Sequence, residues 1–255
     1  MMAGLRAAIW AEAVKLAGST VGRVGSAAIV IGISVISASM LLAAATTTDP
    51  QLLAKLGPVA AGDWRGFLLG AVQITGAGGL GGFAVILAWM FGREFGDGTI
   101  AGLFALPMRR TTIALAKLIV YLAWATAMSL LLAIVLALVG TLAGLGPIGT
   151  GTLEALARQA ALGVMSVAIT LPVAWAATLA RSVLGGVSVA IALVVVAQVS
   201  VLAGLGGWMP LAAPALWAIS LGTTVSPLQL SLLIPFGAIF VVLITQSWRR
   251  MQLDR

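Results

Sequence analysis

The chain alternates long apolar runs with short polar connections. Apolar runs occupy residues 26–45, 67–91, 117–140, 159–180, 183–205 and 228–247. Crossing a bilayer takes a helix of about 20 apolar residues, so each run predicts one spanning helix. The first run ends in small residues as a secretory signal does, but it is longer than the apolar core of about 7–15 residues in such signals. We therefore interpret all six runs as retained helices of an all-α membrane protein.

Composition agrees with this fold class. Hydrophobic residues make up 61% of the 255 residues, charged residues only 8%, and the mean hydropathy is +1.15. Soluble domains carry about 25% charged residues. The polar connections are too short to hold a folded domain, so residues 1–255 are expected to form a single transmembrane domain.

The positive charges predict the orientation of the chain. With six spans, eleven of the fourteen Lys and Arg residues fall on one side of the membrane, and the other side keeps only Lys55, Arg65 and Arg158. The positive-inside rule then places both termini in the cytoplasm. The net charge of +7 is explained by these loops. No basic run is interleaved with aromatic residues, so no nucleic-acid partner is expected.

Motifs for chemistry are missing from the sequence. There is no Cys and no His, and no G-x-x-x-x-G-K-[ST] phosphate loop, H-E-x-x-H or G-x-S-x-G motif. We therefore expect no catalytic residue, metal site or cofactor in this chain. The glycine cluster at 76–83 lies inside an apolar run, and Gly66/Gly70 and Gly78/Gly82 have the small-xxx-small spacing that lets helices pack closely.

A few polar side chains interrupt the predicted spans. A polar group facing lipid is costly, so these side chains are expected to form hydrogen bonds between helices or to line a translocation path. No acidic residue sits in the middle of a span, which weakens the case for a carrier driven by protons or sodium. The polar residues are Gln73, Thr75, Thr170, Gln198 and Ser200, of which Gln73, Thr75 and Gln198 are the candidates for the path.

The outer segment 206–227 gives no simple span. It contains Trp208, Trp217 and three prolines within an apolar background. Both a re-entrant hairpin and an ordinary interfacial loop fit this pattern.

The connection at residues 92–112, by contrast, is polar and unusually long. Asp97 or Thr99 can cap a short helix that Pro107 ends. Ile100, Leu103 and Phe104 fall on one face of that helix at spacings i, i+3 and i+4. We expect this apolar stripe to be exposed, either for a partner protein or for the lipid surface.

The sequence REFGDGTIAGLFALPMRRTTIALAKLI, which contains this connection, resembles the loop between the second and third helices of ABC type-2 transporter permeases. The segment AIWAEAVKLAGS, with Glu12 and Lys15, resembles the amphipathic elbow helix of the same family, here at 4–18. Glu12 shares a helical face with Leu5, Ile9 and Leu16, which departs from good amphipathicity. The residues that carry the loop resemblance are Glu94, Gly98, Thr99, Leu103, Phe104, Leu106, Pro107, Arg109, Arg110 and Lys117.

This resemblance implies the permease subunit of an exporter. Two such subunits, identical or different, would form the path, and each would present a coupling helix to a separate ATP-binding cassette ATPase that binds ATP and Mg. The richness in Arg, Ala, Gly and Val further suggests a GC-rich bacterium and hence its inner membrane. A secondary transporter and a non-transporting immunity or assembly protein are the alternatives. The implied coupling residues are Glu94, Asp97, Gly98, Thr99, Ile100, Leu103, Phe104, Pro107, Arg109 and Arg110.

Overall fold

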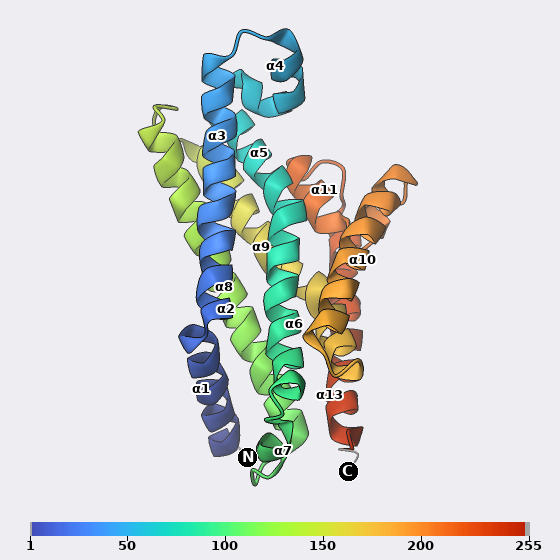
Figure 1. Cartoon of the computed structure of the whole chain (residues 1–255). Helices are drawn as coiled ribbons and strands as arrows, with labels where there is room; N and C mark the ends of the chain where they lie inside the picture. Colours follow the sequence, from blue (N-terminus) through green and yellow to red (C-terminus); the bar gives the residue numbers. More distant parts are fainter. Residues whose placement is uncertain (1, 253–255) are drawn as a thin grey trace.

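The computed structural model describes residues 2–252 and contains helices but no strand in that range. Six helical segments are long and apolar enough to cross a membrane, which confirms the six-span prediction, and each begins or ends a few residues from the apolar run that predicted it. They run up and down as a bundle with both described ends of the chain at the same end (Figure 1). The segments are Thr20–Thr46, Trp64–Gly96, Arg110–Leu142, Thr150–Leu179, Val183–Leu202 and Pro227–Arg250.

Several of these segments are built from more than one helical element. The first joins α2 (Thr20–Ala27), η1 (Ala28–Gly32) and α3 (Ile33–Thr46), and the last joins α12 (Pro227–Ser231) to α13 (Leu233–Arg250). The second joins α5 (Trp64–Ile74), η3 (Thr75–Gly79) and α6 (Leu80–Gly96); both η1 and η3 are π-helical turns. The single-element spans are α8 (Arg110–Leu142), α9 (Thr150–Leu179) and α10 (Val183–Leu202).

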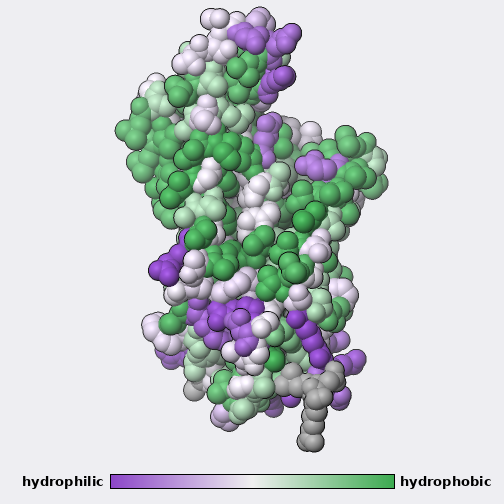
Figure 2. All heavy atoms as spheres, in the orientation of Figure 1, coloured by the Kyte–Doolittle hydropathy of each residue, from purple (hydrophilic) through white to green (hydrophobic). Residues whose placement is uncertain are grey.

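Helix α9 forms the centre of the bundle. It packs against α5, α6, α8, α10, α11 and α13. In the spans that contain α5–α6 and α9, 56% of the most apolar window is buried, against 17% in those of α10 and α13. The hydrophobic residues of α10 and α13 therefore form much of the outer surface. Figure 2 shows hydrophobic side chains over the middle of the molecule and hydrophilic ones gathered toward its ends, as expected for a chain surrounded by lipid.

Glycines allow close packing along the second span, but not at every predicted position. A side-chain carbon at Gly66 would overlap the carbonyl oxygen of Pro58, and one at Gly82 would lie 2.8 Å from Cγ1 of Ile29. No atom lies within 4 Å of the corresponding position at Gly78. Close packing within the chain is therefore confirmed for Gly66 and Gly82, whereas Gly78 points away from the bundle and packs against no helix of this chain.

The connections far from the termini are helical. The first contains α4 (Pro50–Leu56) and the short 3-10 helix η2 (Gly57–Ala61), whose Val59 is buried beneath the start of α5. In the segment 206–227, η4 (Gly206–Trp208) precedes α11 (Ala213–Ile219). Helix α11 packs against α5 and α9, and Ala213 and Ala218 are buried. This segment is therefore a short helix inserted against the bundle and not a loop spread over its surface.

Two further helices complete the end that carries the termini. Helix α1 (Met2–Gly18) lies below α2 in Figure 1 and packs against α8. Helix α7 (Ile100–Phe104) lies in the connection between α6 and α8, at the same end of the bundle (Figure 1). This end therefore brings the two segments that carried the family resemblance next to the same spans.

Candidate functional site

Lys117 lies at the centre of a buried group of charges. Its side chain is only 1% exposed, and the residue lies two turns after the start of α8. The Lys117 Nζ donates hydrogen bonds to Glu12 Oε2 at 2.9 Å, to Glu94 Oε1 at 3.1 Å and to the Met90 carbonyl oxygen at 3.0 Å. All three donor positions of the ammonium group are therefore satisfied.

Lys15 completes the group from the side that faces water. Its Nζ donates to Glu12 Oε1 at 2.9 Å and to Glu94 Oε1 at 2.8 Å, and its side chain is 34% exposed. Burial disfavours the ammonium form, but the hydrogen bonds and charges of Glu94 and Glu12 outweigh it and raise the pKa of Lys15. We call Glu12, Lys15, Glu94 and Lys117 the ion cluster.

The ion cluster ties three helices together. Glu12 and Lys15 come from α1, Glu94 from the last turns of α6, and Lys117 from α8. Its two carboxylates and two ammonium groups sum to zero charge. Charges of this kind are tolerated in a protein interior only when they are paired and hydrogen-bonded. Displacing α6 or α8 would therefore leave a charge unpaired, and displacing α1 would break the hydrogen bonds of Glu12 to Lys117 and of Lys15 to Glu94.

The ion cluster also explains the poor amphipathicity of α1. Glu12 is 5% exposed and Leu16 is 4% exposed, so both lie on the face that packs against α8. Glu12 interrupts the apolar stripe because Lys117 needs a counter-charge there. The opposite face exposes Trp10 and Val14, at 73% and 51%.

Helix α7 turns its apolar stripe toward the bundle. Ile100 is 8% exposed, and Leu103 and Phe104 are half-buried against the main hydrophobic core. The Phe104 ring meets the Trp248 ring of α13 edge-on, with centroids 6.1 Å apart, and the Arg110 guanidinium lies 4.1 Å from the Phe104 centroid. The expectation of an exposed stripe was therefore wrong, because α13 provides an aromatic surface that the local pattern does not reveal.

The turns on either side of α7 contribute most of the exposed polar residues of this loop. Asp97, Gly98 and Thr99 are exposed before α7, and Leu106, Pro107 and Arg109 after it. The expected capping is absent, since Thr99 makes no side-chain cap and Asp97 lies 3.7 Å from Arg93. Pro107 follows the end of α7 as expected.

A groove of about 490 Å³ separates the loop from α1. It is lined by Ala11 and Lys15 of α1, by Arg93 of α6, and by Thr99 and Leu106 of the loop. Glu12 and Glu94 of the ion cluster also line it. A protein segment seated in this groove would therefore contact the loop and α1 at the same time.

The C-terminal helix holds the loop from the other side. Trp248 is fully buried, packs edge-on against Phe91 as well as Phe104, and donates from Nε1 to Thr178 Oγ1 at 3.2 Å. Arg110 donates to the Met251 carbonyl oxygen, and Arg181 to that of Gln252 at 2.8 Å. Sequence reasoning missed Trp248, because a Trp near the end of a span usually indicates only the membrane interface. Arg255, which is one of the eleven basic residues expected on the cytoplasmic side, lies outside the described residues.

The polar side chains within the spans fall into two groups. Thr75 is buried in the bundle, donates to the Ala71 carbonyl oxygen at 2.8 Å and accepts a 2.7 Å hydrogen bond from Gln159 Nε2. Thr170 is likewise buried and lies 2.8 Å from the Tyr121 hydroxyl. These side chains therefore hold helices together.

Gln73 and Gln198 behave differently, because both are exposed on the outside of the single chain. Along the second span, Gln73, Ala77, Gly78 and Gly81 lie at exposed or half-exposed positions. Helix α10, which carries Gln198, packs against α6. The two exposed amide side chains are costly in lipid unless another chain covers them.

Comparison with known proteins agrees with the resemblance found in the sequence. A family model described as "ABC-2 family transporter protein" matches residues 8–199, a range that holds α1 from Ala8, the ion cluster, the loop with α7, the first four spans and the fifth as far as Val199. A search of curated proteins finds no significant match to the chain. With the greater part of its length matched, the chain belongs to the ABC-2 family of transporter membrane proteins.

Proposed function

We propose that this chain is the permease subunit of an ATP-binding cassette exporter, with its translocation path formed by two permease subunits. Membership of the ABC-2 family implies a multi-pass membrane subunit that works with an ATPase. The proposed ATPase is a separate chain that binds ATP and Mg, so hydrolysis takes place in the partner. The direction of transport rests on the resemblance to exporters.

The observation that carries this proposal is the bracing of the loop between α6 and α8. Glu94 is held in the ion cluster, Ile100, Leu103 and Phe104 pack on the bundle, and Arg110 stacks on Phe104. A loop fixed in this way moves together with α1, α6 and α8. In our proposal the exposed side of the loop contacts the ATPase and transmits its motion to these helices. The proposed contact residues are Asp97, Gly98, Thr99, Leu106, Pro107 and Arg109.

Helix α1 serves as the elbow helix in this proposal. Its inner face is bonded to α8 through Glu12, while Trp10 and Val14 are exposed on the other face. Trp side chains favour the interface between lipid and water. An interfacial α1 would keep the ion cluster at the level where the loop leaves the membrane.

The distribution of charge supports cytoplasmic termini. Within the described residues, the basic side chains of α1, of the loop and of the end of α13 belong to the end that carries the termini. Lys55, Arg65 and Arg158 belong to elements at the opposite end. By the positive-inside rule the first end faces the cytoplasm, which is where an ATPase would bind. The proposed membrane is the bacterial inner membrane.

The second permease subunit would cover the exposed surface of the second span. Small residues such as Ala77, Gly78 and Gly81 allow two helices to approach closely, and a pair of subunits would also enclose Gln73 and Gln198. These two amides are then the candidates for contacts along the path. Thr75 is not part of the path in this proposal, because its hydroxyl is already bonded inside the subunit.

Purification of the tagged chain from its own host tests the proposal. We expect an ATPase with a phosphate-loop motif to be retained at a fixed ratio to the permease, and to hydrolyse ATP in the complex. A chain that purifies without such a subunit, and whose deletion leaves export from the host unchanged, would contradict the proposed function.

A further inference from the structure

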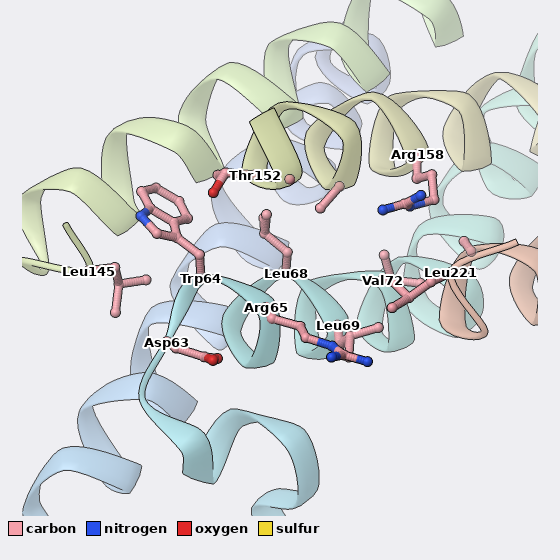
Figure 3. A pocket seen from close by; sticks show the side chains of 13 residues that line it. Asp63, Trp64, Arg65, Leu68, Leu69, Val72, Leu145, Thr152, Arg158 and Leu221 are labelled. Atoms are coloured by element: carbon pink, nitrogen blue, oxygen red, sulfur yellow. The ribbon is translucent and has the colours of Figure 1, made fainter. Parts of the chain in front are cut away.

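A cavity of about 500 Å³ lies at the end of the bundle away from the termini, between the start of α5, the start of α9 and the end of α11 (Figure 3). Leu68 and Val72 of α5, with Leu221 after α11, give it an apolar wall. Trp64 closes one side and donates from Nε1 to the Gly146 carbonyl oxygen at 3.1 Å. This volume lies within the range of about 300–1,000 Å³ that is typical of small-molecule sites.

Arg158 brings an incompletely paired cation to this cavity. Figure 3 shows its guanidinium projecting from α9 toward α5. The side chain is 22% exposed, and its ion pair with Glu154 is long, at 3.9 Å, and involves a carboxylate that is 70% exposed. The Arg158 Nε is buried and has no hydrogen-bond acceptor among the described residues. A buried N–H group without an acceptor is costly, so an acceptor in the cavity would relieve this cost.

Other donors face the same cavity. Arg65 of α5 lines it, is exposed, and forms no ion pair within residues 2–252. Asp63 also lines it, but its Oδ1 already accepts the Gly66 N–H at 2.7 Å as the N-cap of α5. Gly151 and Thr152 belong to the first turn of α9, whose N-cap residue Gly149 offers no side-chain cap. The free N–H groups of this turn favour an anion. The cavity thus combines two cations, one carboxylate and an uncapped helix end.

We propose that this cavity binds an amphipathic anion. A phosphate or carboxylate group would accept hydrogen bonds from Arg158, from Arg65 and from the first turn of α9. Its apolar chain would lie against Leu68, Val72 and Leu221. The site belongs to the single chain, and its occupancy does not depend on an ATPase or on transport.

Binding of decyl phosphate to the purified chain in phosphatidylcholine nanodiscs tests this proposal. We expect a saturable rise in melting temperature that neither decanol, which lacks the charge, nor inorganic phosphate, which lacks the chain, produces at the same concentration. Arg158→Gln keeps a polar side chain but removes the guanidinium and its charge, and it should weaken binding about tenfold or more. Arg65→Gln should weaken it as well. Lys55→Gln removes a cation from the same end outside the cavity and should leave binding unchanged.

Unliganded Arg158→Gln should melt at the wild-type temperature, because Arg158 makes only one long ion pair. If that variant does not fold, the exposed Arg65→Gln variant decides the matter. Wild-type affinity in both arginine variants, or an equal shift with decanol, would overturn the proposal. Nanodiscs that contain phosphatidylglycerol separate the sources of the anion. Loss of decyl phosphate binding there identifies an anionic lipid as the occupant, and retained binding identifies a soluble amphiphile.

Discussion

Phe104 and Trp248 meet edge-on with their ring centroids 6.1 Å apart, although 144 positions separate them in the sequence. The contact joins the short helix α7 to the last span. The Arg110 guanidinium lies over the Phe104 ring and donates to the Met251 carbonyl oxygen. Phe104 therefore holds the loop on the bundle, and the exposed turns on either side of α7 remain for a partner.

Phe104→Asp is expected to destabilise the chain, whereas Leu106→Asp is expected to affect only the contact with the ATPase. Phe104→Asp places a charge against Trp248 and should lower the melting temperature in detergent, since loss of a half-buried aromatic contact costs about 1–3 kcal/mol. Leu106 is 46% exposed, so Leu106→Asp should melt like the wild type. If the loop contacts the ATPase, Leu106→Asp should nevertheless lose partner retention or substrate-stimulated ATP hydrolysis.

Melting curves and co-purification, measured on the same two preparations, check this prediction. Ala105→Asp, at an exposed position of the same loop, gives a second surface variant for comparison. Normal partner binding and normal coupled hydrolysis in both Ala105→Asp and Leu106→Asp would argue that the loop contacts lipid only.

Removing the buried ammonium group of Lys117 should destabilise the chain more than the substitutions in the loop. In Lys117→Met the carboxylates of Glu12 and Glu94 keep only the half-buried Lys15 as a counter-charge. Breaking a buried ion pair in this way typically costs about 3–5 kcal/mol. We expect a large fall in melting temperature or in yield. The double variant with Glu12→Gln should recover much of it, because Glu94 and Lys15 then remain as a neutral pair at 2.8 Å. A single Lys117→Met variant with wild-type melting would contradict the role of the ion cluster.

The contribution of Lys15 should be independent of pH near neutrality. Its pKa is raised above the unfolded value of about 10.4, so its stabilising effect is fully present below that pH and is lost only as pH rises through the folded pKa. The difference in melting temperature between wild type and Lys15→Met should therefore be the same at pH 6 and pH 8. A difference that shrinks markedly within this range would show that Lys15 is already losing its proton.

The six spans were predictable because hydropathy is a local property. The ends of the helices were harder to predict. The third apolar run begins at Lys117, whereas α8 begins at Arg110 and therefore carries Lys117 inside it. A lysine within a predicted span needs an acid at the same end of the bundle, and few were available there. Glu12 and Glu94 could therefore have been proposed as its partners from the sequence.

The packing of α7 against the bundle could not have been predicted from the sequence. Its stripe at Ile100, Leu103 and Phe104 is equally compatible with a partner, with lipid or with the bundle itself. The choice depends on where Trp248 lies, and this is set by the packing of α13 against α8 and α9. Gly78 and Gly82 likewise share one spacing motif, yet their surroundings differ: Gly78 lies inside the π-helical turn η3 and faces open space, whereas Gly82 lies in α6 and faces Ile29.

Thiol labelling tests the proposed orientation directly, because the sequence contains no native cysteine. Cysteines at the exposed positions Thr48 and Thr150 should react with an impermeant maleimide in intact cells. A cysteine at Ala101 should react only after the cells are opened. Ala101 is exposed and helical, whereas Gly98 has a φ of 68° that a side chain would strain. Labelling of Ala101→Cys from outside would exclude cytoplasmic termini.

Gly78 and Gly82 provide a matched pair for the proposed subunit interface. Gly78→Leu adds a side chain into open space on the surface of the single chain, whereas Gly82→Leu forces one against Ile29. Overpacking of this kind costs about 1–3 kcal/mol, so Gly82→Leu should lower the melting temperature of the chain itself. Gly78→Leu should leave the melting of the single chain unchanged and should instead separate two close helices at the interface.

Mass measurement of the detergent-purified variants distinguishes these effects. We expect wild type to contain two permease subunits, and Gly78→Leu to shift toward one at a protein concentration where wild type stays paired. Gly78→Ala, which adds a single methyl group, should have a much smaller effect. A Gly78→Leu protein that pairs as tightly as wild type would mean that this surface faces lipid, and Gln73 and Gln198 would then lose their proposed place along a path between two subunits.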